Sequence, residues 1–271
     1  TIVAIGTSMP ELAVSFFAAL EGSADISIGN VVGSNVFNVY AALGVCGLFA
    51  PMLFTRSNVR RDIPLCIAVS ALFLIVVATG GNINRTEGII LLASYIAMLY
   101  FTIRADRKRL MEQSCEVDDT PTMPIWRIVV WIVGGLLGLI YGGQYCVESA
   151  SAIARSLGVS EATIAITLIA GGTSLPELAS SLVSILRGSP SLALGNVLGS
   201  NIANILLILG TCSTITPLTM GGITMFDVYV ALAATVVVML SALVIGRDKL
   251  TRIEGVMFLV IYAAYVYVLI N

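Results

Sequence analysis

Long apolar runs separated by short polar stretches make up most of this 271-residue chain. Apolar runs of about 20 residues are typical of helices that cross a membrane. The expected spans are residues 1–20, 26–49, 63–80, 87–103, 125–145, 162–186, 191–215, 225–246 and 253–270. The pattern therefore predicts an all-α membrane protein with nine spans visible in this sequence.

Composition supports this class and narrows the chemistry. Hydrophobic residues make up 58% of the chain and charged residues 11%, whereas soluble domains carry about a quarter charged residues. The net charge of −2 is too small to indicate a strongly acidic or basic partner, so we expect no nucleic-acid partner. There is no histidine, and the five cysteines form no CxxC pair, so we expect no disulfide, resident metal or other cofactor.

The chain contains an internal repeat. At a shift of 166 residues, residues 1–51 match residues 167–217 without a gap at 24 of 51 positions, and a weaker match pairs 87–95 with 254–262. The shared strings are Gly-Thr-Ser-x-Pro-Glu-Leu and Gly-Asn-Val-x-Gly-Ser-Asn. Equivalent positions lie five spans apart, an odd number, so the second copy enters the membrane from the opposite side. Such inverted-topology repeats are typical of secondary transporters.

The repeat predicts how the chain is organised. We expect a first repeat half at residues 1–104, a linker at 105–124 and a second half at 125–271. The counterpart of 125–166 would lie before Thr1, so we expect a tenth span upstream that completes a five-plus-five arrangement. Of the 14 Lys and Arg residues, all but Arg85 and Arg155 fall on one side of the expected spans. That side, with the linker, is expected to be cytoplasmic, and the C-terminus outside.

The string "AIGTSMPEL" at residues 4–12, echoed by "IAGGTSLPEL" at 169–178, interrupts an apolar run. Pro10 has no N–H, so the carbonyl of Gly6 loses its helical partner. We expect local unwinding that exposes main-chain oxygens between Ala4 and Gly6. A carboxylate at the membrane centre costs about 2.5–3.5 kcal/mol, so Glu11 and its counterpart Glu177 predict a compensating bound cation. Both should face one cavity near mid-membrane.

The second string adds further oxygen ligands. Ser34 and Asn38 are four residues apart and share one helix face, and Ser200 and Asn204 repeat this spacing. The Gly29–Gly33 spacing predicts close helix packing. Carboxylates, hydroxyls, amides and carbonyls are hard oxygen ligands, which suit Ca²⁺ with its 6–8 oxygens better than zinc or copper. Na⁺ would accept the same ligands.

The doubled pair of strings resembles the α-repeats of sodium/calcium exchangers in the cation/calcium exchanger superfamily. The resemblance implies ten helices in two inverted halves and alternating access, in which Na⁺ entering down its gradient drives Ca²⁺ out. Inorganic cations and the lipid bilayer are then the expected partners. The implied ligands are Thr7, Ser8, Glu11, Ser34, Asn38, Thr173, Ser174, Glu177, Ser200 and Asn204, with the main-chain carbonyls of Ala4 and Ala170 for Na⁺.

Two features narrow what the resemblance implies. Some members, including potassium-dependent exchangers, carry Asp at the position of Asn204. Asn leaves two central carboxylates, whose charge of −2 balances one Ca²⁺, and makes K⁺ coupling less favourable. The linker is too short for a regulatory domain, so we expect a prokaryotic type in the plasma (inner) membrane.

Three other functions use the same residues. An H⁺/divalent cation antiporter would protonate Glu11 and Glu177 in place of binding Na⁺. A channel fits inverted repeats with interrupted helices less well than an antiporter does. An intramembrane hydrolase could use paired carboxylates, but the chain has no HExxH string and its glutamates stand among cation ligands, so we expect no enzyme.

Overall fold

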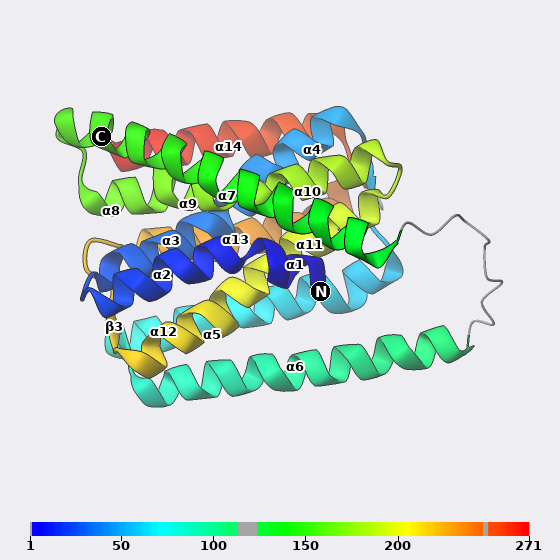
Figure 1. Cartoon of the computed structure of the whole chain (residues 1–271), viewed down its shortest axis with the longest axis horizontal. Coiled ribbons are helices and arrows are strands. Elements are labelled where there is room, and N and C mark those ends of the chain that lie inside the picture. Colours follow the sequence, from blue (N-terminus) through cyan, green and yellow to red (C-terminus); the bar gives the residue numbers. More distant parts are fainter. Residues whose placement is uncertain (1, 113–123, 246–248, 271) are drawn as a thin grey trace.

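A computed structural model describes residues 2–112, 124–245 and 249–270, and most of these residues are helical (Figure 1). The first half comprises α1 (Ile2–Thr7), α2 (Met9–Leu20), α3 (Ala24–Val36), η1 (Phe37–Leu43), α4 (Gly44–Phe49), β1 (Met52–Leu53), η2 (Asn58–Asp62), α5 (Ile63–Gly80), β2 (Asn82–Ile83) and α6 (Arg85–Glu112), where η denotes a π-helix. The second comprises α7 (Ile125–Ser156), α8 (Glu161–Ile164), η3 (Ala165–Ile169), α9 (Ala170–Thr173), α10 (Leu175–Leu186), α11 (Pro190–Ala203), η4 (Asn204–Leu209), α12 (Gly210–Ile215), β3 (Leu218–Thr219), α13 (Met225–Leu240), η5 (Ser241–Ile245), β4 (Lys249–Leu250) and α14 (Arg252–Ile270).

Most of the expected spans are helices long and apolar enough to cross a membrane. Within the described residues, six such helices are Ala24–Phe49, Asn58–Gly80, Arg85–Arg104, Pro190–Ile215, Met225–Ile245 and Arg252–Ile270. The pair Glu161–Thr173 and Leu175–Leu186 forms a seventh if it is counted as one bent span. The all-α membrane class is confirmed, and the total of nine spans stays a prediction.

The helix interruption before each proline involves fewer residues than predicted. The first span breaks only at Ser8, and the second copy bends by 41° at its equivalent, Ser174. The amide of Ser8 still donates to the carbonyl of Ala4 at 3.1 Å, and that of Ser174 to the carbonyl of Ala170 at 3.1 Å. Each proline stands at the start of a new helix, where its missing N–H breaks no hydrogen bond. In each copy the helix is therefore interrupted at a single residue, Ser8 or Ser174.

Two helices are longer than their apolar runs. Helix α6 continues to Glu112, so residues 105–112, expected to be linker, are helical, and residues 113–123 of that linker lie outside the described residues. Helix α7 continues to Ser156 instead of ending near residue 145. Arg, Lys, Met and Glu favour helix as strongly as most apolar residues do, so a polar run need not end a helix that leaves the membrane.

The two halves interlock through equivalent contacts. Helix α14 packs on α4, and its equivalent α6 packs on α12. Glycines allow both approaches: a Cβ at Gly255 would lie 2.8 Å from the carbonyl oxygen of Gly44, and one at Gly210 would lie 2.8 Å from the amide nitrogen of Leu92. The short strands also pair between the halves: β1 pairs with β4 and β2 with β3, both antiparallel. Each half is thus completed by the other, as an inverted repeat requires.

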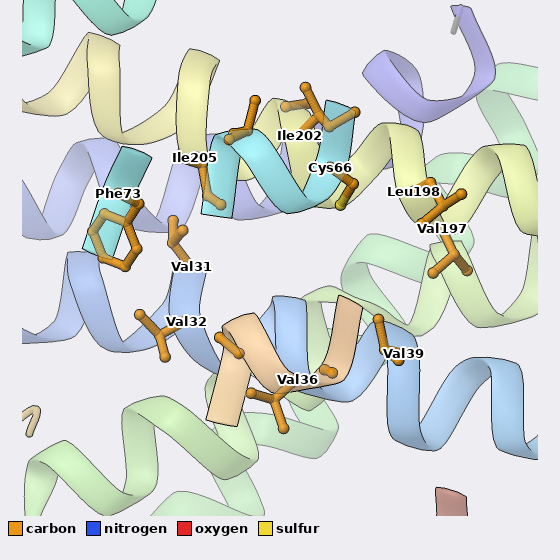
Figure 2. Packing of buried hydrophobic residues seen from close by; sticks show 14 of the residues in the cluster. Val31, Val32, Val36, Val39, Cys66, Phe73, Val197, Leu198, Ile202 and Ile205 are labelled. Atoms are coloured by element: carbon orange, nitrogen blue, oxygen red, sulfur yellow. The ribbon is translucent and has the colours of Figure 1, made fainter. Parts of the chain in front are cut away.

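The core of the molecule lies where α3 and α11 pass close to each other. Figure 2 shows Val31 and Val36 from α3, Phe73 from α5, and Val197 and Ile202 from α11 among the buried apolar side chains. Both α3 and α11 are largely buried, whereas much of α6 and α14 is exposed. The two copies of the Gly-Asn-Val-x-Gly-Ser-Asn string therefore stand on the two central helices.

The close packing predicted for Gly33 can be tested by adding one methyl group. A Cβ at Gly33 would lie 2.1 Å from the carbonyl oxygen of Ile166 in η3, which is backbone and cannot rotate away. Gly33→Ala should therefore destabilise the protein by at least about 1–3 kcal/mol, seen as a lower melting temperature in detergent. Gly195→Ala is the matched control, because a Cβ there meets nothing within 4 Å, and an unchanged Gly33→Ala protein would contradict this packing.

Candidate functional site

The two glutamates of the repeated string lie in the first turns of α2 and α10, directly after the helix breaks. Both side chains are completely buried (0% exposed). The N-terminus of a helix carries partial positive charge, which favours a carboxylate there. The helix break therefore has a local consequence for function, because each new helix begins two residues before a buried acid, at Met9 and Leu175.

Each glutamate is held by a serine from the other half. Ser174 donates its hydroxyl to Oε1 of Glu11 at 2.9 Å, and Ser8 donates to Oε1 of Glu177 at 3.1 Å. Ser200 also donates to Oε1 of Glu177, at 3.3 Å. The two acids are close enough to interact electrostatically. The predicted shared site thus brings Glu11 and Glu177 together with Ser8 and Ser174.

The remaining predicted hydroxyls surround the same place but are engaged with main-chain oxygens. Thr7 donates to the carbonyl of Ala4 at 3.3 Å, and Thr173 to that of Ala170 at 3.2 Å. Ser34 donates across the halves to the same Ala170 carbonyl at 3.3 Å. The carbonyls of Ala4 and Ala170 thus already accept hydrogen bonds, and their role as Na⁺ ligands stays a prediction.

Four buried oxygens of the predicted ligands have no hydrogen-bond partner within the described part of the chain. They are Oε2 of Glu11, Oε2 of Glu177, Oδ1 of Asn38 and Oδ1 of Asn204. Asn38 and Asn204 follow Ser34 and Ser200 by one helical turn and lie on the same helix faces. Buried polar atoms are almost always paired, so four unpaired oxygens in symmetry-related positions indicate a site that accepts a positively charged ligand.

The donor set limits which ligand fits. Among the described residues, no group of three or more His, Cys, Asp or Glu side chains could hold a metal ion. Two carboxylates, two amide oxygens and neighbouring hydroxyls supply hard, exclusively oxygen coordination, which alkali and alkaline-earth cations accept and soft metals do not.

Sequence reasoning assigned no role to two asparagines that fix the glutamates in place. Asn30 donates to the main-chain oxygen of Glu11 at 3.2 Å, and Asn196 donates to that of Glu177 at 3.4 Å. Both also donate to a serine of the preceding helix, Ser15 at 3.0 Å and Ser181 at 3.2 Å. The repeat itself could have indicated this role, because both asparagines and both serines are identical in its two copies.

Hydrogen bonds distinguish the two halves: Ser34 donates to a main-chain carbonyl, whereas its equivalent Ser200 donates to Glu177. A threonine bond differs as well. Thr173 donates to Oδ1 of Asn30 at 3.1 Å. Among the described residues, the equivalent acceptor, Oδ1 of Asn196, has no partner, although Thr7 stands where Thr173 stands in the other copy. The two halves therefore have equivalent residues in different local arrangements.

Two cavities approach the site from different elements. One, of about 510 Å³, lies between α2, α7, η3 and α9 and is lined by Pro10, Thr173 and the exposed acids Glu21 and Glu148. The other, of about 220 Å³, is lined by Ala4, Arg61, Asp62, Gly195 and Gly199. The first reaches Gly172 and Thr173 of the Gly-Thr-Ser string of the second half, and the second reaches Ala4 and the Gly195–Gly199 face of α11.

Known proteins share this sequence pattern and this fold. The sequence pattern of the family described as "Sodium/calcium exchanger protein" matches residues 1–104 and 127–271. The chain belongs to the sodium/calcium exchanger family. This family consists of membrane cation/Ca²⁺ antiporters and not of enzymes, so the chain is a multi-pass membrane protein of a transporter family.

Individual relatives agree over nearly the whole chain. CaxA of Alkalimonas amylolytica, which is named as an antiporter, is 38% identical over 279 residues, covering 100% of this chain and 86% of the relative. The sodium/calcium exchanger MaX1 of Methanosarcina acetivorans is 30% identical over 306 residues, covering 99% and 87%. A solved structure of the sodium-calcium exchanger NCX_Mj, soaked with Na⁺ and Sr²⁺, superposes with a TM-score of 0.78 at 29% identity, covering 98% and 84%. The predicted prokaryotic exchanger family and inverted-repeat fold are confirmed.

The anchoring of the glutamate backbone can be tested at Asn196. Asn196→Ala removes the hydrogen bonds to the carbonyl of Glu177 and to the hydroxyls of Ser180 and Ser181. We expect a loss of about 1–3 kcal/mol of stability, measured as a lower melting temperature in detergent. Ser184→Ala should change little, because that hydroxyl donates to a carbonyl of its own helix. Equal melting temperatures for the two variants would contradict the anchoring role.

Proposed function

We propose that this protein exchanges Na⁺ for Ca²⁺ across the membrane by alternating access, with both ions bound at Glu11 and Glu177. The observation that carries the proposal is the set of four unpaired buried oxygens on Glu11, Glu177, Asn38 and Asn204. Ca²⁺ takes 6–8 oxygen ligands in flexible geometry. The neighbouring hydroxyls of Ser8, Ser174 and Ser200 supply further oxygens without a change of fold.

Charge favours competition between the two ions at this site. Two ionised glutamates carry −2, which one Ca²⁺ neutralises completely. Na⁺ bound to the same carboxylates removes that attraction for Ca²⁺, so occupancy by one ion opposes occupancy by the other. The relatives MaX1 and NCX_Mj, which are named as sodium/calcium exchangers, support the same pair of ions.

The differences between the halves support alternating access. In transporters with inverted repeats, the two copies exchange conformations as the site opens to one side and then to the other. The hydrogen bond from Thr173 to Asn30, which the Thr7–Asn196 pair does not make, is a difference of this kind. The two cavities are lined by different parts of the repeat, one by Gly172 and Thr173 and the other by Ala4 and Gly199, which is compatible with separate routes to the site.

The remaining assignments follow the family resemblance. Thr7, Thr173 and Ser34 complete the ligand set, with the carbonyls of Ala4 and Ala170 for Na⁺. The placement of basic residues favours the plasma membrane, with the linker at residues 105–124 cytoplasmic and the C-terminus outside. Residues 1–104 and 125–271 act as the two repeat halves.

Ion flux through proteoliposomes tests the proposal. Vesicles that contain the purified protein are loaded with Na⁺ and diluted into Na⁺-free buffer containing radioactive Ca²⁺. We expect Ca²⁺ uptake that requires internal Na⁺ and falls by at least about 100-fold in Glu177→Gln, because a charged ligand is lost from a buried site. Glu161→Gln, which removes an exposed acid paired with Arg155, is the matched control and should transport normally.

A second arm of the same assay addresses the H⁺/divalent cation alternative. Each glutamate keeps one unpaired oxygen that can hold a proton, so competition between H⁺ and Ca²⁺ is chemically possible. Vesicles receive a pH gradient with no Na⁺ present. Uptake driven by this gradient and indifferent to Na⁺ would replace the proposed coupling with the alternative, and uptake under neither gradient would refute both.

A further inference from the structure

Four asparagines form a hydrogen-bonded cluster between the two halves, at the ends of α3 and α11. Asn38 donates its Nδ2 to Oδ1 of Asn201 at 3.1 Å, and Asn204 donates its Nδ2 to Oδ1 of Asn35 at 3.0 Å. Asn35 and Asn201 donate to each other's main-chain oxygens, at 3.4 and 3.2 Å. All four bonds cross from one half to the other, and all four side chains are at most 3% exposed.

The direction of these bonds determines which end of each amide faces the site. The oxygen and the nitrogen of an Asn amide have nearly the same shape, but only the oxygen can bind a cation. A main-chain carbonyl can only accept, so the amides of Asn35 and Asn201 must turn their Nδ2 atoms toward it. Their Oδ1 atoms are then left to accept from Asn204 and Asn38, respectively.

This arrangement in turn orients the two amides at the site. Asn38 and Asn204 must turn Nδ2 toward the cluster, and their Oδ1 atoms consequently point away from it. Those two Oδ1 atoms are the unpaired buried oxygens that stand one helical turn after Ser34 and Ser200. If either amide rotated by half a turn, an N–H₂ group that repels cations would replace a ligand oxygen.

We propose that Asn35 and Asn201 are positioning residues that hold the amide oxygens of Asn204 and Asn38 toward the transported cation. The inference rests on the proposed cation site and goes beyond it, because neither residue touches the ion. Each half thereby orients a ligand that belongs to the other half. Residues behind the ligands of a metal typically change its affinity by about 10–100-fold when they are replaced.

A double-mutant cycle between Asn35 and Asn204 separates positioning from general structure. Asn35→Leu keeps the shape of the side chain but removes the acceptor for Asn204. Direct Ca²⁺ titration of the purified protein by calorimetry should show an affinity at least about tenfold lower. In the Asn204→Asp background the same replacement should change the affinity by less than about threefold, because a carboxylate presents oxygen at both ends and needs no orienting partner.

Controls make each outcome informative. Asn58→Leu removes another buried asparagine, which bonds Thr55 and Asp62 far from the cluster in sequence, and should lower the melting temperature without changing Ca²⁺ affinity. If Asn35→Leu does not purify as a folded protein, the equivalent cycle uses Asn201→Leu with Asn38→Asp.

The outcomes for this inference and for the proposed function differ. Equal losses of affinity in the Asn204 and Asn204→Asp backgrounds would overturn the positioning role while leaving the Ca²⁺ site in place. Absence of Ca²⁺ binding by the unmodified protein would overturn the proposed function and this inference with it.

Discussion

Two carboxylates buried inside a bundle of apolar helices are the constraint on which the rest of this structure depends. Each costs several kcal/mol to place there unless other groups compensate. The compensation for Glu11 comes from Ser174, and that for Glu177 from Ser8 and Ser200. Because Ser8 and Ser174 act across the halves, neither half can satisfy its own glutamate fully. The close packing of the two halves is therefore required by the chemistry of the site as well as by the apolar core.

The interlocked architecture provides that packing. Gly33 lets α3 approach the main chain of η3, next to the carbonyl of Ala170 that Ser34 reaches. At the periphery, α6 and α14 each pack on a helix of the other half. The asparagine cluster obeys the same symmetry in all four of its bonds, whereas the Thr173–Asn30 bond has no counterpart in the other half. The asparagine cluster is thus equivalent in both halves. The differences between them lie at Thr173 and at Ser34, whose equivalent Ser200 bonds Glu177 instead of a main-chain carbonyl.

Much of this could be predicted from the sequence because it depends on local pattern. Apolar run length predicted most of the spans, and the repeated Pro-Glu predicted the buried acids. The π-helical turns that begin at Phe37 and Asn204 could not be predicted, because no residue type marks a π-helix. We expected several unwound residues before Pro10, but the helix is interrupted only at Ser8. Pro10 stands in the first turn of α2, where its backbone nitrogen needs no hydrogen bond. The partners of Asn35 could not be predicted either, because they depend on the register of two crossing helices far apart in sequence.

The neutral amides at Asn38 and Asn204 decide the charge balance of the proposed site. With both glutamates ionised, one Ca²⁺ leaves the site neutral, and so do two Na⁺. A carboxylate in place of Asn204 would leave a charge of −1 with one Ca²⁺ bound, and a further monovalent cation would then be needed to neutralise it. An amide supplies the same oxygen without that charge, but only if its nitrogen is held elsewhere. An asparagine at positions 38 and 204 therefore has to be held with its oxygen toward the site. Asn35 and Asn201 accept hydrogen bonds from the amide nitrogens of Asn204 and Asn38 and can hold them in this orientation.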